Sequence, residues 1–203
     1  MTPDEQWMKR CLELAHQAGA RGEVPVGALI VAADSVVAEG VESSRGLLDP
    51  SAHAEVCAIR NACRARRSSA LAGLTLYSTV EPCVLCGYVI RRVGLSRVVY
   101  GIPAGALGAC TSTYALLTDW TLSGAPPPTV IAGVLHAECA ALMRAYATPI
   151  QEPDARRLVR RRGSSCRSAR AHWQAMRGQG RARHHIVDRH EGRVDLRSAS
   201  CRC

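Results

Sequence analysis

The sequence has no long apolar run and no recognisable leader. Its 203 residues contain apolar stretches such as 27–33, far shorter than the ~20 residues that cross a membrane. The opening Met1-Thr2-Pro3-Asp4-Glu5 is acidic and leads into no early apolar segment, so a secretory signal is not expected. The ten cysteines are not expected to form disulfides, because a reducing compartment is the simplest location. Five of them are expected as small buried hydrophobic residues, namely Cys11, Cys57, Cys63, Cys110 and Cys139. These absences argue against a membrane or secreted protein and favour a cytoplasmic one.

Acidic and apolar residues are scarce in the last quarter of the chain. Residues 151–203 hold 14 arginines against five acidic residues, a net charge of +9. Residues 1–150 hold Lys9 and 11 arginines against 12 acidic residues, a net charge of zero. Because the last part has little to bury, we expect a folded domain over 1–150 and a disordered, basic low-complexity tail over 151–203.

The tail has two other interpretations. An arginine-rich arm would bind RNA phosphates and order on contact, although Trp173 is the only tail residue that could stack on a base. An altered reading frame would give the same mixture of Arg, Ser, Gly, His and Cys. On each interpretation the tail lies outside the folded domain.

Two short motifs carry the chemistry. His53-Ala54-Glu55 is followed thirty residues later by Pro82-Cys83-Val84-Leu85-Cys86. One imidazole and two thiolates hold a zinc ion with three protein ligands and leave its fourth position for water. We therefore predict one zinc ion held by His53, Cys83 and Cys86.

The same motifs supply a proton carrier. Hydrolytic deamination adds the oxygen of water to a ring carbon that bears an amine, and then expels ammonia. Zinc serves this reaction by lowering the pKa of a bound water from 15.7 to roughly 7. A carboxylate must move protons from the water to the ring nitrogen and the leaving amine. Glu55 is placed for that role, whereas the turn at Pro82 is expected to keep Glu81 outside the ligand geometry, where it should matter far less. This is the pattern of zinc-dependent nucleobase deaminases.

A closed structural zinc site is the alternative. Cys57 follows His53 by four residues and would share its helix face, so it could supply a fourth ligand. The chain would then be a zinc-stabilised binding module and not an enzyme. That interpretation leaves Glu55 and Pro82 without a role.

Hydrophobic periodicity predicts alternating helices and strands. Both motifs fall at helix starts, whose partial positive charge favours thiolate over thiol. Strands that alternate with helices form a sheet covered by helices on both faces. The predicted helices are 4–20, 53–67, 83–92, a short one near 112–119, and 136–146; the predicted strands are 26–32, 36–41, 74–79, 97–100 and 129–134, with a polar loop over 42–52.

Five segments resemble the cytidine and deoxycytidylate deaminase superfamily, specifically its bacterial tRNA adenosine deaminase and guanine deaminase branch. The resemblance covers about residues 4–146. It implies a three-layer α/β/α fold with a five-stranded mixed sheet, one zinc per subunit, a homodimer, and a nucleobase, nucleoside or tRNA anticodon loop as substrate. The segments are Gly22-Glu23-Val24-Pro25-Val26-Gly27-Ala28, Asp49-Pro50-Ser51-Ala52-His53-Ala54-Glu55, Glu81-Pro82-Cys83-Val84-Leu85-Cys86, Arg97-Val98-Val99-Tyr100-Gly101 and Glu138-Cys139-Ala140-Ala141-Leu142.

The resemblance also assigns substrate contacts, with two departures. Val24 would form an apolar wall against the base, and Ala54 a second contact. Glu42 stands where the tRNA enzymes have an asparagine that hydrogen-bonds the base, and 102–106 lacks their charged residues. We expect deamination most like that of tRNA adenosine. The alternative is a free base or nucleoside of guanine or cytosine type, which Glu42 and the neutral charge of 1–150 favour.

Overall fold

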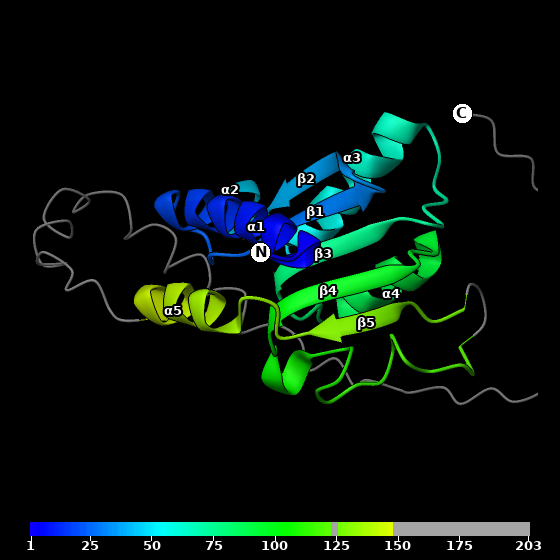
Figure 1. The fold of residues 1–203 in the computed structure, drawn as a ribbon. Coiled ribbons are helices and arrows are strands. Elements are labelled where there is room, and N and C mark those ends of the chain that lie inside the picture. The colour runs from blue at the N-terminus through cyan, green and yellow to red at the C-terminus, as the bar shows by residue number, and fades with distance from the viewer. Residues whose placement is uncertain (123–125, 148–203) are drawn as a thin grey trace, which may run out of the picture. The chain divides into compact units, whose positions relative to one another are not determined.

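The structure, a computed structural model, describes residues 1–122 and 126–147. The tail expected over 151–203 lies outside these residues. Helices and strands alternate along the described chain (Figure 1). The elements are α1 (Pro3–Ala20), β1 (Gly27–Ala32), β2 (Ser35–Val41), α2 (Ser44–Leu47), α3 (Ala54–Arg66), β3 (Thr75–Val80), α4 (Val84–Val93), β4 (Arg97–Ile102), the 3₁₀ turn η1 (Gly105–Leu107), β5 (Thr129–Ala132) and α5 (His136–Ala147).

The five strands form one mixed sheet in the order β2-β1-β3-β4-β5. β1 pairs antiparallel with both β2 and β3, whereas β3, β4 and β5 are parallel. Helices α1 and α5 lie on one face of the sheet, with α3 and α4 behind the other (Figure 1). The predicted three-layer α/β/α fold with a five-stranded sheet is confirmed.

Alternate strand residues serve the two helix layers, since successive side chains of a strand point to opposite faces. In β1, Ala28 and Ile30 pack in the cluster that includes Ala58 of α3 and Ile90 of α4. Their neighbours Leu29 and Val31 pack in the cluster on the other side, with Met8 and Cys11 of α1 and Cys139 of α5. The sheet therefore holds α3 and α4, which carry the two motifs, on the same face.

A glycine sets how closely α3 approaches the sheet. A Cβ on Gly40 of β2 would lie 2.1 Å from the carbonyl oxygen of Ala54 and 2.3 Å from the amide nitrogen of Ala58. Only a residue without a side chain lets the first turns of α3 lie directly on β2. The position of His53 and Glu55 at the start of that helix depends on this contact.

Two predicted segments differ in the structure. The expected polar loop over 42–52 contains the short helix α2. The helix expected near 112–119 is reduced to a turn in which the N–H groups of Thr118 and Asp119 donate to the carbonyl of Ala115. The N–H groups of 110–112, just before this turn, donate to the carboxylate of Glu81. Among the described helices, none is both long and apolar enough to cross a membrane.

Candidate metal centre

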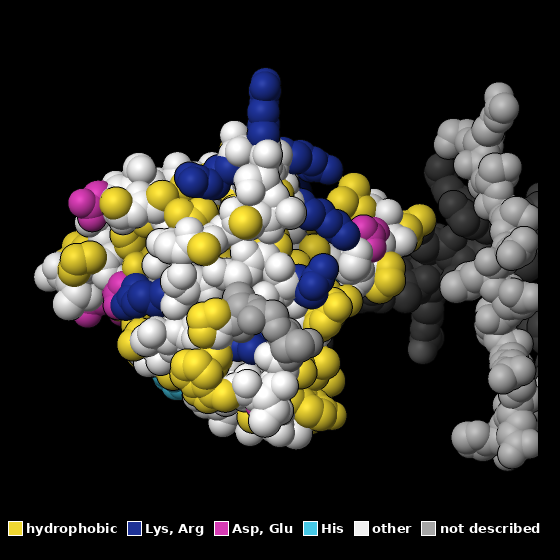
Figure 2. Space-filling model, turned by 90° about the vertical axis from the view of Figure 1, so that its right-hand side faces the viewer, with side chains coloured by type: hydrophobic (Ala, Val, Ile, Leu, Met, Phe, Trp, Pro, Cys, Tyr) yellow, Lys and Arg dark blue, Asp and Glu magenta, His cyan; other side chains and the backbone are white. Residues whose placement is uncertain are grey.

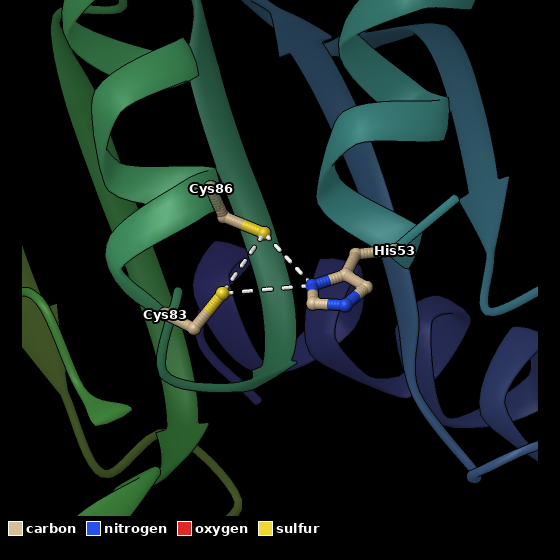
Figure 3. A group of neighbouring side chains, drawn as sticks. All are labelled: His53, Cys83 and Cys86. Carbon is tan, nitrogen blue, oxygen red and sulfur yellow. Dashed lines mark hydrogen bonds between the residues drawn. The ribbon is translucent and has the colours of Figure 1, made fainter. Parts of the chain in front are cut away.

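The three predicted metal ligands converge from two helix starts. His53 is the N-cap residue of α3, Cys83 is the N-cap of α4, and Cys86 lies in the first turn of α4. The His53 Nδ1 atom lies 3.5 Å from each sulfur, and the two sulfurs are 3.7 Å apart (Figure 3). The structure thus brings together residues that are thirty positions apart in the sequence.

These distances fit a tetrahedral zinc ion. Bonds of about 2.3 Å to sulfur and 2.0–2.1 Å to nitrogen give tetrahedral edges of about 3.8 Å between sulfurs and about 3.6 Å between sulfur and nitrogen. Histidine, cysteine and acidic side chains can all bind metals. Among those of the described residues, one group of three brings its ligand atoms within 4.8 Å of one another, and it consists of His53, Cys83 and Cys86. Cys57 is not part of it and lines a separate groove. A closed four-ligand site therefore lacks its expected fourth ligand.

The electrostatics of the group also favour a cation. The hydrogen bond from the Cys86 thiol, followed by that from His53, lowers the pKa of Cys83 to about 4. The same interaction with Cys83 raises the pKa of Cys86, and the thiolate of Cys83 raises the pKa of His53 to about 9. The two sulfurs lie only 3.7 Å apart, so two thiolates there would repel each other. A bound cation would let both sulfurs ionise.

Glu55 lies beside the three ligands and is not one of them. Its side chain is buried, and one oxygen accepts a hydrogen bond from the Ser78 hydroxyl at 2.9 Å. The other oxygen lies 3.5 Å from the Cys86 sulfur. Burial raises the pKa of Glu55 to about 6, so this carboxyl both gains and loses a proton readily near neutral pH. Ser78 was not predicted, and because Thr75 and Thr79 lie in the same strand, no sequence signal singled it out.

A cavity of about 320 Å³ opens over the metal ligands. Its size is at the lower end of the range for small-molecule sites. The predicted residues Val24, Glu42 and Glu55 line it, whereas Ala54 does not. The remaining lining residues are Val26, Ser44, His53, Val80, Glu81, Cys83, Cys86, Ala104 and Leu107.

Glu42 presents a carboxylate to this cavity. Its Oε1 accepts from the Ser44 hydroxyl at 2.5 Å, and its Oε2 accepts from the backbone N–H of Ala54 at 3.3 Å. The Ala54 N–H is therefore already engaged by Glu42, and its side chain is fully buried. Glu42 fixes the start of α3 and leaves further acceptor lone pairs for a ligand.

Glu81 organises the loop that closes the opposite side of the cavity. Its Oε1 accepts from the N–H groups of Cys110, Thr111 and Ser112 at 3.0, 2.9 and 3.1 Å. Its Oε2 accepts from the N–H of Ala104 at 3.0 Å and from the Ser112 hydroxyl. Burial alone would raise the pKa of Glu81, but these donors outweigh it and lower the pKa. Glu81 lines the cavity as well but is not one of the grouped metal ligands, as expected.

The same loop is fastened to the metal-binding segment. The N–H of Ala109 donates to the carbonyl of Pro82 at 2.9 Å, and Gly108 pairs with Cys83 as an isolated bridge. A Cβ on Gly108 would lie 2.3 Å from Oε2 of Glu81. The cavity wall formed by Ala104 and Leu107 is thus held to the ligand Cys83 through Glu81 and its neighbours.

Replacing Glu81 with glutamine should loosen this loop. A hydrogen bond to a charged group contributes about 1.5–3 kcal/mol, so amide hydrogens of 104–112 should exchange at least about tenfold faster. Hydrogen exchange resolved by mass spectrometry measures this. Glu138→Gln, at an exposed acid on α5, is the control and should leave the loop protected. Equal protection in both variants would show that Glu81 does not hold the loop.

Comparison with known proteins supports this interpretation of the site. The profile of the cytidine and deoxycytidylate deaminase zinc-binding region matches residues 1–102. A tRNA-specific adenosine deaminase from Haemophilus influenzae is 38% identical over 137 residues, which cover 67% of this chain and 78% of that protein. The enzyme of the same name from Agrobacterium fabrum is 35% identical over 72% of this chain and 95% of its own length.

Solved structures agree with the fold. One from a study of A-to-I editing by tRNA:A34 deaminases is 36% identical, with a TM-score of 0.64 over 68% of this chain and 98% of that chain. A guanine deaminase from Nitrosomonas europaea is 23% identical, with a TM-score of 0.62 over 70% of this chain and 83% of that chain; this likeness concerns the fold alone. The chain therefore belongs to the cytidine and deoxycytidylate deaminase family, whose zinc-binding region it carries, and it is a hydrolase acting on C–N bonds.

Proposed function

We propose that this enzyme deaminates adenosine in tRNA, converting adenosine and water into inosine and ammonia. The observation that carries the proposal is the geometry of His53, Cys83 and Cys86 with Glu55 beside them, in a chain 38% identical to a tRNA-specific adenosine deaminase. The reducing cytosol, where thiols remain free for metal binding, is the proposed location.

The proposed roles follow from the contacts. His53, Cys83 and Cys86 would hold one zinc per chain, and zinc when bound lowers the pKa of a water molecule to roughly 7. Glu55, through the oxygen that faces Cys86, would accept the two protons of the attacking water in turn and pass one to the purine N1 and one to the leaving amine. Ser78 holds the other oxygen at 2.9 Å and so fixes the direction of the carboxyl. Val24 packs against the base, and Glu42 contacts its edge.

The second candidate is a free base of the guanine type. Glu42 favours it, because a carboxylate accepts hydrogen bonds and guanine offers ring N–H donors where adenine offers acceptors. Its two oxygens already accept from Ser44 and Ala54, which holds the carboxyl group in the cavity wall. The relatives and the +9 charge of residues 151–203 favour RNA, and we therefore place tRNA first.

We further propose that the enzyme is a homodimer. Val84, Leu85 and Tyr88 of α4 are exposed, Tyr88 by 60%, and they lie on the helix that carries two metal ligands. Covering these residues with a second copy would remove apolar surface from water. Tyr88→Glu should shift sedimentation toward the monomer, whereas Trp120→Glu, at another exposed aromatic residue, should not. A wild-type protein that sediments as a monomer at micromolar concentration would contradict the proposal.

Mutations of a metal ligand and of the proton carrier should have different effects. Cys83→Ala should lose zinc, as measured by elemental analysis, because two protein ligands remain. Cys57→Ala is its control and should keep zinc. Glu55→Ala should keep zinc and fold while losing several orders of magnitude in ammonia release, since proton transfer loses its carrier. Full zinc in Cys83→Ala, or near-normal turnover in Glu55→Ala, would contradict the assigned roles.

The substrate is tested by competition between an anticodon stem-loop and free purines. Full-length enzyme and a chain ending at Ile150 are compared at two salt concentrations, after zinc content and circular dichroism establish that both are folded. For tRNA we expect RNA turnover that falls with salt and with removal of the tail. Salt-insensitive turnover of a free base by both chains would replace tRNA with the second candidate.

A further inference from the structure

A second groove lies directly behind one wall of the cavity. Residues 41–44 form this wall, and their side chains alternate between its two sides. Glu42 and Ser44 line the cavity, whereas Val41 and Ser43 line the groove. The groove has a volume of about 380 Å³ and runs between β2, α2 and α3. A ligand that leaves the cavity over this wall therefore meets the groove next.

Arginines dominate the charge of this groove. Arg21, Arg60 and Arg64 line it, and all three are exposed. Its one acidic lining residue is Glu39. Both oxygens of Glu39 are held by the guanidinium of Arg10, at 2.7 and 3.0 Å. The same guanidinium also bonds Glu13 at 2.6 Å, so it is shared between two acids. Glu39 is nevertheless held from outside the groove, and no acid that lacks a partner occurs among the groove's lining residues.

The arginines are not fully explained by the fold. Arg64 lies in the last turn of α3, where a cation is favourable to the helix dipole. Arg60 holds Asp49 and Ser51 in the segment before the metal motif. Arg21 is the C-cap residue of α1, so its charge is also favourable to a helix dipole. Its side chain, however, has no hydrogen-bond or ion-pair partner among the described residues. A cation with no local partner beside two others indicates an anionic ligand.

The basic character continues along α3. No acidic residue occurs in 56–80, a range that contains Arg60, Arg64, Arg66 and Arg67. Figure 2 shows Lys and Arg side chains gathered on the face where α3 and α4 end, with few acidic side chains there. The zero net charge of residues 1–150 thus conceals an uneven distribution. The groove therefore carries more positive charge than the zero net charge of residues 1–150 suggests.

We propose that the groove lined by Arg21, Arg60 and Arg64 binds the phosphates of the RNA nucleotides next to the one whose base enters the cavity. This inference rests on the proposed tRNA substrate. Guanidinium groups bind phosphate oxygens through paired N–H donors. The wall of residues 41–44 would lie between the RNA base and the phosphates of its neighbours. The cavity would then bind the base, and the groove would bind the phosphates of the same RNA strand.

The test neutralises the groove without touching the catalytic residues. The full-length double variant Arg21→Gln/Arg64→Gln is compared with Lys9→Gln/Arg92→Gln. The control removes the same charge at exposed residues that lie outside the groove and have no hydrogen-bond or ion-pair partner among the described residues. Arg60 is left intact because it supports the segment before His53. Steady-state deamination of an anticodon stem-loop is measured for each chain at several salt concentrations, together with zinc content.

The groove variant should raise KM for the stem-loop by about tenfold or more, with kcat and zinc content within about twofold of wild type. The slope of log KM against log salt should fall by about 1.5, since each phosphate contact contributes about 0.7–0.9. The control should change neither by a comparable amount. Equal KM and slope in both variants, with RNA turnover intact in the wild type, would overturn the groove alone. Absence of RNA turnover in the wild type would overturn the tRNA substrate and the groove together.

Discussion

The site depends on bringing two helix starts within bonding distance of one cation. His53 begins α3 and Cys83 begins α4, and their ligand atoms lie 3.5 Å apart. Two close approaches make this possible. Gly40 lets α3 lie on β2, and Gly87, whose Cβ would be 2.8 Å from that of Ala109, lets the loop after β4 lie on α4. A larger residue at either glycine would move one half of the ligand set relative to the other.

Two carboxylates in the same cavity have opposite environments. Glu55 is buried and receives one hydroxyl donor, so its pKa is raised to about 6. Glu81 is equally buried but receives four backbone N–H groups and a hydroxyl, so its pKa is lowered. When the environments of two carboxyl groups shift their pKa values in opposite directions, the shifts indicate the role of each group. Glu55 is left able to exchange protons, whereas Glu81 remains ionised and holds the wall of the cavity.

The sequence predicted those parts of the site whose chemistry needs a particular side chain. Thiolate and imidazole ligands at helix starts have a recognisable spacing, and the alternation of strands and helices predicted the layers. The role of Glu81 could not be predicted, because most of its partners are backbone N–H groups 23–31 residues away, which every sequence contains. The helix expected near 112–119 is likewise reduced to a turn that follows these N–H groups. Net charge likewise carried no information on where Arg21 and Arg64 lie relative to one another.

The proposed function gives one explanation for both departures from the tRNA enzymes, which are Glu42 and the uncharged segment 102–106. The uncharged segment 102–106 leaves the loop side of the cavity without cations, so phosphates must be held elsewhere. The groove lies on the opposite side, behind the wall that contains Glu42. Next to this wall, Arg45 donates to the hydroxyl of Tyr146 at 2.5 Å, which ties the end of α5 to α2. The arginine-rich residues 151–203 follow that helix in the sequence. A carboxylate at position 42 is tolerable beside an RNA backbone only where such cations offset it, and the arginines behind the wall provide that charge.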